Sequence, residues 1–357
     1  MKKLLSAAVV LASVASLSSC FPSGEVKVDD TEFDQIVEKA EQIENFSLNF
    51  DIPLNVPDSV PTLYTSLKTW NMLDIDSAFG IDGLKEHLEY NSNHFPEEKR
   101  YVDISASGLL GYDFGDIMYD IYFDDKKDKD VPREFACTYA ALNSFDFTDY
   151  DKELSHFPKA EALSKAEELL HSLGITEIGK PTVYPITREY AAAAAECTVD
   201  ELGWNDSDEV YYIVYPVSFG GIELLQEDIN ILAADYYSQT ASRISIIMSA
   251  DELISFQCML YSDSISFSEE AEKIISPTEA AGILTDHYAG AANTSKRDFN
   301  SLRLVYVPTD TNGTGFVYEP AWLFEGTDSS VYDGEEYKGK FYELIYAKTG
   351  VRYANYG

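Results

Sequence analysis

The sequence predicts an α+β protein, built as tandem modules in which one helix packs on a small antiparallel sheet. Two observations predict this class. Segments with apolar residues at helical spacing recur along the chain, and runs rich in Tyr, Val, Ile and Phe follow two of them. The 357 residues are 45% hydrophobic and 13% aromatic, which is enough for sizeable cores and excludes a disordered chain.

Helix signals are clearest in two segments of the chain. Pro158 lies at the start of one segment and Gly174 follows its end, which is typical of a helix start and a left-handed stop. Ser276 and Glu279 can form a capping box at the start of the other segment. Helical spacing predicts five helices in all, at residues 31–45, 76–90, 158–173, 188–197 and 277–289.

Strands are predicted in two groups of four, one group after each of the two clearest helices. The predicted strands cover residues 181–187, 209–219, 242–248 and 253–261, then 302–307, 315–324, 341–347 and 351–356. Both groups are predicted to close with a similar hairpin, since residues 246–253 can be aligned with 344–351. A looser copy of the same pattern occurs at 103–109. This repeat predicts three modules, at residues 31–150, 151–270 and 271–357.

The first twenty residues have the layout of an export signal. The start MKK is positive, and the apolar stretch of fourteen residues that follows is too short to span a bilayer as a stable helix. The stretch ends in LSSC at residues 17–20, which resembles the signal of bacterial lipoproteins. This resemblance implies that Cys20 is the lipid attachment site and the first residue of the mature chain. An ordinary secretory signal with an incidental cysteine is the alternative.

The predicted location is therefore the outer face of the cytoplasmic membrane. Residues 1–19 are the predicted signal peptide and residues 20–30 a tether, and lipid chains on Cys20 would anchor the protein without a transmembrane helix. The formal charge is −36, from 62 acidic and 26 basic residues. Such a charge repels phosphate backbones and anionic headgroups, so nucleic-acid binding and membrane docking through a basic patch are not expected.

Three further cysteines, Cys137, Cys197 and Cys258, cannot all pair with one another because their number is odd. Cys258 lies in an apolar run that is typical of a strand, which favours a buried free thiol. A bridge from Cys197 to Cys137 or to Cys258 remains an alternative.

No catalytic signature occurs in the sequence. None of the five histidines belongs to an H-E-x-x-H motif, and we predict neither a metal nor a cofactor. The tripeptide Lys348-Thr349-Gly350 also occurs in penicillin-recognising enzymes, but a hairpin turn is the preferred interpretation. Paired carboxylates for glycoside hydrolysis need only converge in space, and 62 acidic residues leave that chemistry open. The prediction is a protein that is not an enzyme.

The C-terminal region carries a second resemblance. A capped helix beginning SPTEAA at residue 276 is followed by a strand with EPAW at 319–322 and by the sequence AKTGV at 347–351. This order is similar to PepSY-type modules and to the YycI-like and YpeB-like envelope proteins of Gram-positive bacteria. The resemblance implies a helix on a small antiparallel sheet, a Pro-x-Trp strand in mid-sheet and contact with another protein. The acidic residue usual before the final turn of that family is missing here.

These observations predict a membrane-anchored extracytoplasmic lipoprotein that acts as a non-enzymatic binding or regulatory module for another envelope protein. The alternative is a surface lipoprotein that binds, and possibly hydrolyses, carbohydrate or peptide. A pocket with converging Trp, Tyr and carboxylate side chains would favour the alternative. An exposed sheet edge or apolar patch would favour the binding of a partner protein.

Overall fold

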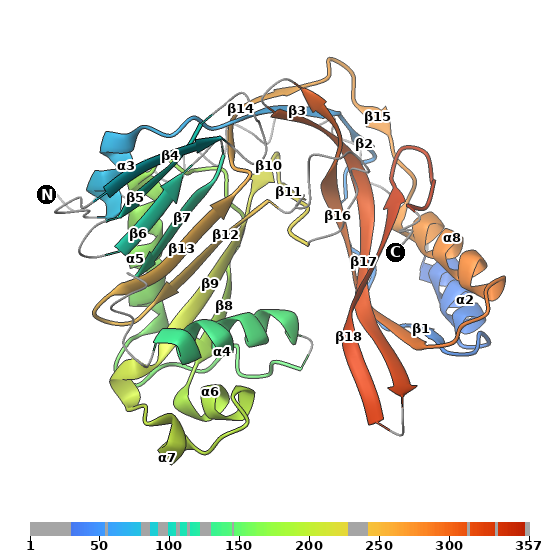
Figure 1. The fold of residues 1–357 in the computed structure, drawn as a ribbon. Coiled ribbons are helices and arrows are strands. Elements are labelled where there is room, and N and C mark those ends of the chain that lie inside the picture. Colours follow the sequence, from blue (N-terminus) through green and yellow to red (C-terminus); the bar gives the residue numbers. More distant parts are fainter. Residues whose placement is uncertain are drawn as a thin grey trace, which may run out of the picture.

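Two eight-stranded sheets form the limbs of an arch, with β3 and β14 along its top (Figure 1). The computed structural model describes residues 30–53, 56–79, 86–91, 99–104, 108–112, 115–121, 130–144, 146–227, 242–312, 315–332 and 335–353. Among the helices of these segments, none is long and apolar enough to cross a membrane.

The first sheet is antiparallel throughout and has helices on both faces. Its order is β4 (Glu86–Asn91), β5 (Lys99–Ile104), β6 (Gly108–Tyr112), β7 (Ile117–Ile121), β13 (Leu253–Met259), β12 (Arg243–Met248), β9 (Val210–Pro216) and β8 (Thr182–Ile186). One face packs on α3 (Met72–Phe79) and α5 (Lys159–Ser172). The other packs on α4 (Asp130–Leu142) and α6 (Arg188–Ala194), with α7 (Val199–Leu202) and the 3-10 turn η2 (Asp206–Asp208) beside them.

The second sheet is built around a long hairpin of the C-terminal third. Its order is β10 (Ser218–Phe219), β11 (Ile222–Leu224), β16 (Lys296–Asn312), β17 (Gly315–Tyr332), β3 (Leu63–Leu67) and β14 (Ser262–Phe267). Two more strands lie off this path: β1 (Phe46–Leu48) runs parallel on β16, and β18 (Glu335–Tyr346) is antiparallel on β17. The helices α2 (Asp30–Ala40) and α8 (Pro277–Ala289) pack together beside this sheet, and β2 (Ser59–Val60) pairs with β15 (Glu272–Lys273).

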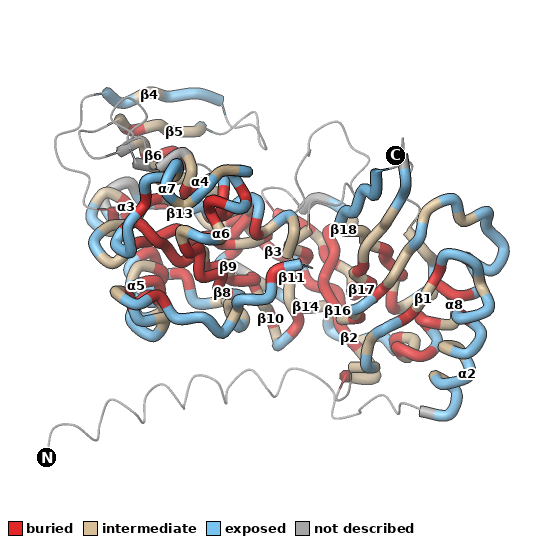
Figure 2. Tube along the Cα trace, turned by 90° about the horizontal axis from the view of Figure 1, so that it is seen from below, coloured by how far each residue is buried: buried red, intermediate tan, exposed pale blue. Residues whose placement is uncertain are grey.

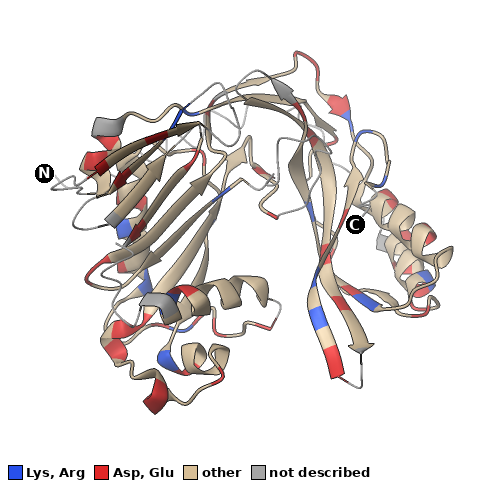
Figure 3. Cartoon of the chain, viewed as in Figure 1, with Lys and Arg blue, Asp and Glu red and all other residues tan. Residues whose placement is uncertain are grey.

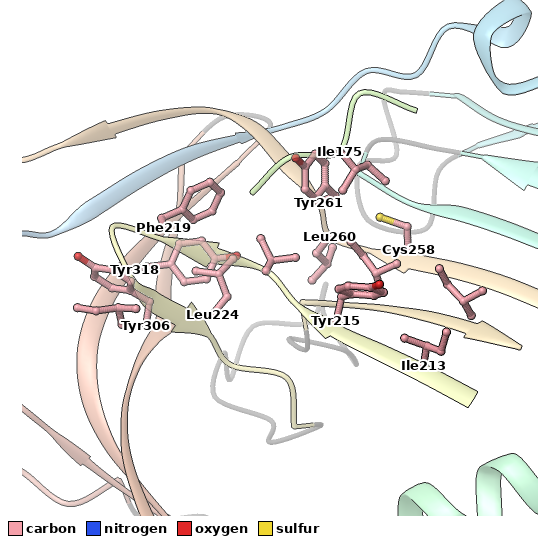
Figure 4. Close-up of a cluster of buried hydrophobic side chains, with 14 of the residues drawn as sticks. Ile175, Ile213, Tyr215, Phe219, Leu224, Cys258, Leu260, Tyr261, Tyr306 and Tyr318 are labelled. Atoms are coloured by element: carbon pink, nitrogen blue, oxygen red, sulfur yellow. The ribbon is translucent and has the colours of Figure 1, made fainter. Parts of the chain in front are cut away.

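One hydrophobic core connects the two sheets. Phe219 and Tyr318 of the second sheet belong to the same buried cluster as Tyr215 and Cys258 of the first (Figure 4). The buried Tyr261, between β13 and β14, ties this junction to the loop after α5, because its hydroxyl accepts a hydrogen bond from the backbone N–H of Thr176 at 3.0 Å. Figure 2 shows buried residues in both limbs and along the region that joins them.

The predicted fold class is wrong. Strands hold 44% of the described residues and helices 26%, and the sheets are large and curled, so the chain is not a series of helices on small sheets. The helix pattern was read most accurately at α5 and α8, which match their predicted ranges. The error lies in the strands. Their composition identifies strand residues but not the partners of each strand, and distant segments pair here into two continuous sheets.

Some predicted elements differ from the structure in detail. The predicted helix at 76–90 is half wrong, because α3 ends at Phe79 and residues 86–91 form the edge strand β4. The predicted last strand, 351–356, is reduced within the described residues to one bridge between Ile345 and Arg352. The helix predicted at 188–197 is confirmed as α6.

Strand pairing joins all three predicted modules. Strands β4 to β7 lie in the segment 31–150, yet they share the first sheet with strands from 151–270. The second sheet takes strands from all three segments. Whether a cut at residue 150 or 270 yields a fragment that folds by itself stays a prediction.

The hairpin of β16 and β17 contains one close approach of backbones. Gly326 lies opposite Phe299, next to an irregularity in the pairing. A β-carbon on Gly326 would lie 2.8 Å from the Cα of Phe299 and closer still to the carbonyl oxygen of Asp298. Ordinary carbon–carbon contacts are about 3.5–4.0 Å, so only glycine fits this position.

Candidate docking surface on helix α4

Helix α4 exposes a row of large apolar side chains. Phe135, Tyr139 and Leu142 are 50%, 42% and 65% exposed. They stand at positions i, i+4 and i+7, so they share one side of the helix. Single exposed apolar residues are normal on a protein surface, but three in a row on one helix form a patch of the kind that contacts partners. We call Phe135, Tyr139 and Leu142 the α4 stripe.

The other side of α4 is fixed to the first sheet. Ala136, Cys137 and Ala140 are buried there, and their small side chains let the helix lie close to the sheet. Arg133 is also buried, and its Nε donates to the backbone carbonyl of Asp208 at 2.9 Å. The Arg133 guanidinium also lies 3.5 Å from the carboxylates of Asp208 and Glu252. The α4 stripe is therefore presented on a helix that is held on its inner side.

Aromatic rings continue from the α4 stripe into the protein. Tyr139 lies 6.4 Å from Tyr190 of α6, measured between ring centroids, and Tyr190 lies 5.0 Å from Phe147. Phe147 in turn meets Tyr184 of β8 at 5.2 Å, in an edge-to-face arrangement. Such pairs stabilise by about 0.5–1.5 kcal/mol beyond the area they bury. The stripe is thus the exposed end of a packed aromatic cluster.

The charged residues from Glu134 to Asp149 are all acidic, and one of them, Asp149, pairs with Lys152 at 3.8 Å. Arg133 is the only basic residue of α4 and it is buried, whereas Glu134 is only half-buried and Asp146 and Asp149, just after the helix, are exposed. In Figure 3, α4 is mostly uncharged, with acidic colour toward its N-terminal part. A segment that combines apolar side chains with Lys or Arg would complement both the apolar stripe and the acidic charges beside it.

Sequence reasoning missed α4, and with it this surface. No glycine stop follows the segment 130–142, unlike the two segments with the clearest helix signals. The spacing of Phe135, Tyr139 and Leu142 was the available signal.

The structure places the cysteines apart from one another. Cys137, Cys197 and Cys258 are all free, so neither alternative bridge is formed, and the prediction of a buried free thiol at Cys258 is confirmed. Burial raises the pKa of the thiols of Cys137 and Cys258, which keeps both protonated and unreactive. Cys20 lies outside the described residues, so lipid attachment there stays a prediction.

Lys348 of the tripeptide Lys348-Thr349-Gly350 makes structural contacts. Its Nζ lies 2.6 Å from a carboxylate oxygen of Glu319 and 2.8 Å from one of Glu272, and it donates to the hydroxyl of Thr62 at 2.7 Å. These contacts tie the turn after β18 to the segments before β3 and before α8. Gly350 has a φ of +69°, which fits the predicted hairpin turn. In the part of the chain that the structure describes, no group of His, Cys, Asp or Glu side chains is arranged to hold a metal ion.

The fold has a counterpart among solved structures. A crystal structure of an uncharacterized protein from Eubacterium rectale ATCC 33656 matches 91% of this chain and 98% of its own, with a TM-score of 0.63 and 14% sequence identity. This likeness shows the fold alone. YycH from Bacillus subtilis matches 83% of this chain and 55% of its own, with a TM-score of 0.34 and 10% identity. This TM-score is too low to support a conclusion about the fold or the function of this chain. No family model and no curated protein matches the sequence.

Proposed function

We propose that the chain is a lipid-anchored extracytoplasmic binding protein that acts without catalysis and docks another envelope protein on the α4 stripe. The observation that carries this proposal is the exposed row of Phe135, Tyr139 and Leu142 on a helix fixed from behind. Both features that would favour a partner protein are present, since β4 is an exposed edge strand, but only the α4 stripe is apolar throughout. The predicted export signal supports the location, since such a signal would direct the residues after Cys20 out of the cytoplasm.

The chemistry of the partner follows from that of the surface. Docking on the α4 stripe buries aromatic and aliphatic side chains, and aromatic anchors of this kind dominate the energetics of many interfaces. The acidic surroundings disfavour an acidic partner and attract a basic one. The best fit is an amphipathic segment with an apolar side and with Lys or Arg beside it, of the type that packs as a helix against an apolar surface.

A defined probe tests this docking. We expect a synthetic amphipathic helix of Leu and Lys to bind the purified chain, and a matched helix of Leu and Glu to bind at least tenfold more weakly. Fluorescence anisotropy of labelled peptides gives both dissociation constants. The paired substitution Phe135→Ser and Leu142→Ser should weaken binding of the Leu/Lys helix by a further tenfold, which corresponds to about 1.4 kcal/mol.

The matched control removes two apolar side chains that lie outside the α4 stripe and are about as exposed as those of the stripe. Val331 and Tyr337, near the end of the β17–β18 hairpin, are 74% and 52% exposed. The substitutions Val331→Ser and Tyr337→Ser should leave the affinity unchanged. Equal weakening by the two pairs of substitutions would show that the peptide does not bind specifically at the α4 stripe, and no weakening by either pair would show that it binds through charge alone. Either result would overturn the proposal. So would self-association of the chain that depends on Phe135 and Leu142 in sedimentation experiments.

A further inference from the structure

A second feature of the molecule, which shares no residue with the α4 stripe, is a cavity of about 170 Å³ beside β18. It lies where the C-terminal residues Arg352 and Tyr353 run next to the last part of this strand. Arg297, from the start of β16, and Phe341 and Tyr342 of β18 also line it. Two arginines beside one cavity are unusual in this chain, because its acidic residues outnumber its basic ones by 62 to 26.

Arg352 is held in place by one buried carboxylate. Its Nε donates to one oxygen of Glu343 at 2.8 Å and its Nη2 to the other at 2.6 Å, in a two-pronged contact. The Glu343 side chain is only 4% exposed, and it also accepts a hydrogen bond from the hydroxyl of Tyr288 at 2.6 Å. Arg352 therefore has a fixed orientation at the cavity wall.

Arg297 is fixed by three neighbours. Its Nε donates to Asp328 at 3.1 Å and its Nη1 to the hydroxyl of Tyr288 at 3.0 Å. Its guanidinium also lies 4.4 Å from the ring centroid of Phe341, which is a favourable distance for a cation–π contact. Tyr288 thus links the two arginines. Its hydroxyl donates to Glu343, the partner of Arg352, and accepts from Arg297.

Each guanidinium group keeps donors to spare. A guanidinium has five N–H groups. Arg297 uses two of them for Asp328 and Tyr288, and Arg352 uses two for Glu343 and at most a third for Tyr288. At least two N–H groups on each arginine are therefore left without an acceptor among the described residues. The charges of the two arginines balance those of Glu343 and Asp328, so an entering anion meets oriented donors without an excess of negative charge.

The size and walls of the cavity limit what can enter. A cavity of about 150 Å³ accommodates benzene, so 170 Å³ holds one ring or a side chain of similar size. Phe341, whose ring lies against the Arg297 guanidinium, offers aromatic surface on the same side as the arginines. Forked arginine donors match the two oxygens of a carboxylate. One aromatic wall with oriented guanidinium groups beside it suits an acid that carries a small ring.

We propose that this cavity binds a carboxylate carried on a small aromatic or apolar body, through Arg297 and Arg352 and against Phe341. The ligand is either a free organic acid or the C-terminal residue of a peptide, because both present the same group. This site is separate from the α4 stripe, and its proposal stands or falls independently of docking there.

Ligand-observed NMR with the purified chain tests the site. Benzoate, N-acetylphenylalanine, N-acetylphenylalanine amide and inorganic phosphate are titrated separately. We expect saturation-transfer signals and a measurable dissociation constant for N-acetylphenylalanine, with binding of its amide at least tenfold weaker. If benzoate binds as well as N-acetylphenylalanine, the ligand is a free acid, and if only the latter binds, it is a C-terminal residue. Both results support the site. No binding of either acid, or equal binding of phosphate, would overturn it.

The substitution Arg352→Lys separates recognition from folding. Lysine retains a positive charge beside Glu343 but loses the forked geometry, so the fold should persist while affinity falls about tenfold. Arg188→Lys is the matched control, because Arg188 is likewise partly exposed and paired with acidic side chains, on α6 and η2. It should leave the affinity for N-acetylphenylalanine unchanged. Circular dichroism confirms that each variant is folded. An unchanged affinity in folded Arg352→Lys protein would refute the role of the arginine.

Discussion

The substitution Gly326→Ala is expected to lower the free energy of unfolding by about 3 kcal/mol. The added β-carbon would collide with the backbone of β16 at Asp298 and Phe299. No flexible side chain can move aside there, so the two longest strands of the second sheet would have to separate locally. Overpacking of this kind costs about 1–3 kcal/mol and occasionally more. Denaturant unfolding followed by circular dichroism measures the change.

Gly339→Ala is the matched control for this prediction. Gly339 lies in β18 of the same sheet, and a β-carbon there would have no heavy atom within 4 Å. Its backbone is also compatible with alanine, so the substitution should be neutral or should stabilise by about 0.4–1 kcal/mol. A loss of stability in Gly339→Ala that equals the loss in Gly326→Ala would contradict the steric explanation.

Replacing Cys20 by Ala is expected to release the protein from the membrane. Lipid chains on the cysteine would contribute about 0.8 kcal/mol for each buried methylene group, and without the thiol no chain can be attached. No helix among the described residues can take over this role. Fractionation of cells, followed by immunoblotting, should find the wild type with the membranes and the variant in the soluble fraction or still carrying its signal peptide.

Cys197→Ala provides the control for the anchor. Cys197 is a free, half-buried thiol far from the export signal in sequence, so its loss should leave the protein in the membrane fraction. The lipidation hypothesis fails if processed Cys20→Ala protein remains bound to membranes as fully as the wild type. Such a result would favour an ordinary secretory signal with an incidental cysteine.

The features that were predicted best from the sequence are those that depend on residues close together in the chain. The capping box of Ser276 and Glu279 begins α8 in the structure, with Pro277 at its first position. Pro158 and Gly174 likewise flank α5 closely. These signals act over a few residues, so the sequence alone contains them. The turn at Gly350 belongs to the same class, because a left-handed residue there is a local requirement.

Long-range pairing was not predictable by the same means. Ser47 of β1 bonds Asp298 of β16 across 251 residues of sequence, and nothing in either segment identifies the other. The cavity has the same origin, since Arg297 and Arg352 meet only because β16 and the C-terminal residues lie near each other in the folded sheet. Helix α4 was missed for a different reason, because no glycine stop marks its end as one marks the ends of α5 and α8.

The order in which the strands of the second sheet occur in the chain has a consequence for export. A chain that crosses the membrane from its N-terminus delivers β1 and β3 early, but their partners β16 and β17 follow only after more than two hundred residues. Closing loops of that length is slow, and contacts between distant residues delay folding. An anchored chain would therefore wait at the membrane with apolar strands unpaired. If the chain is exported as predicted, it would be most exposed to envelope proteases during this interval, and holding by a chaperone would help it most.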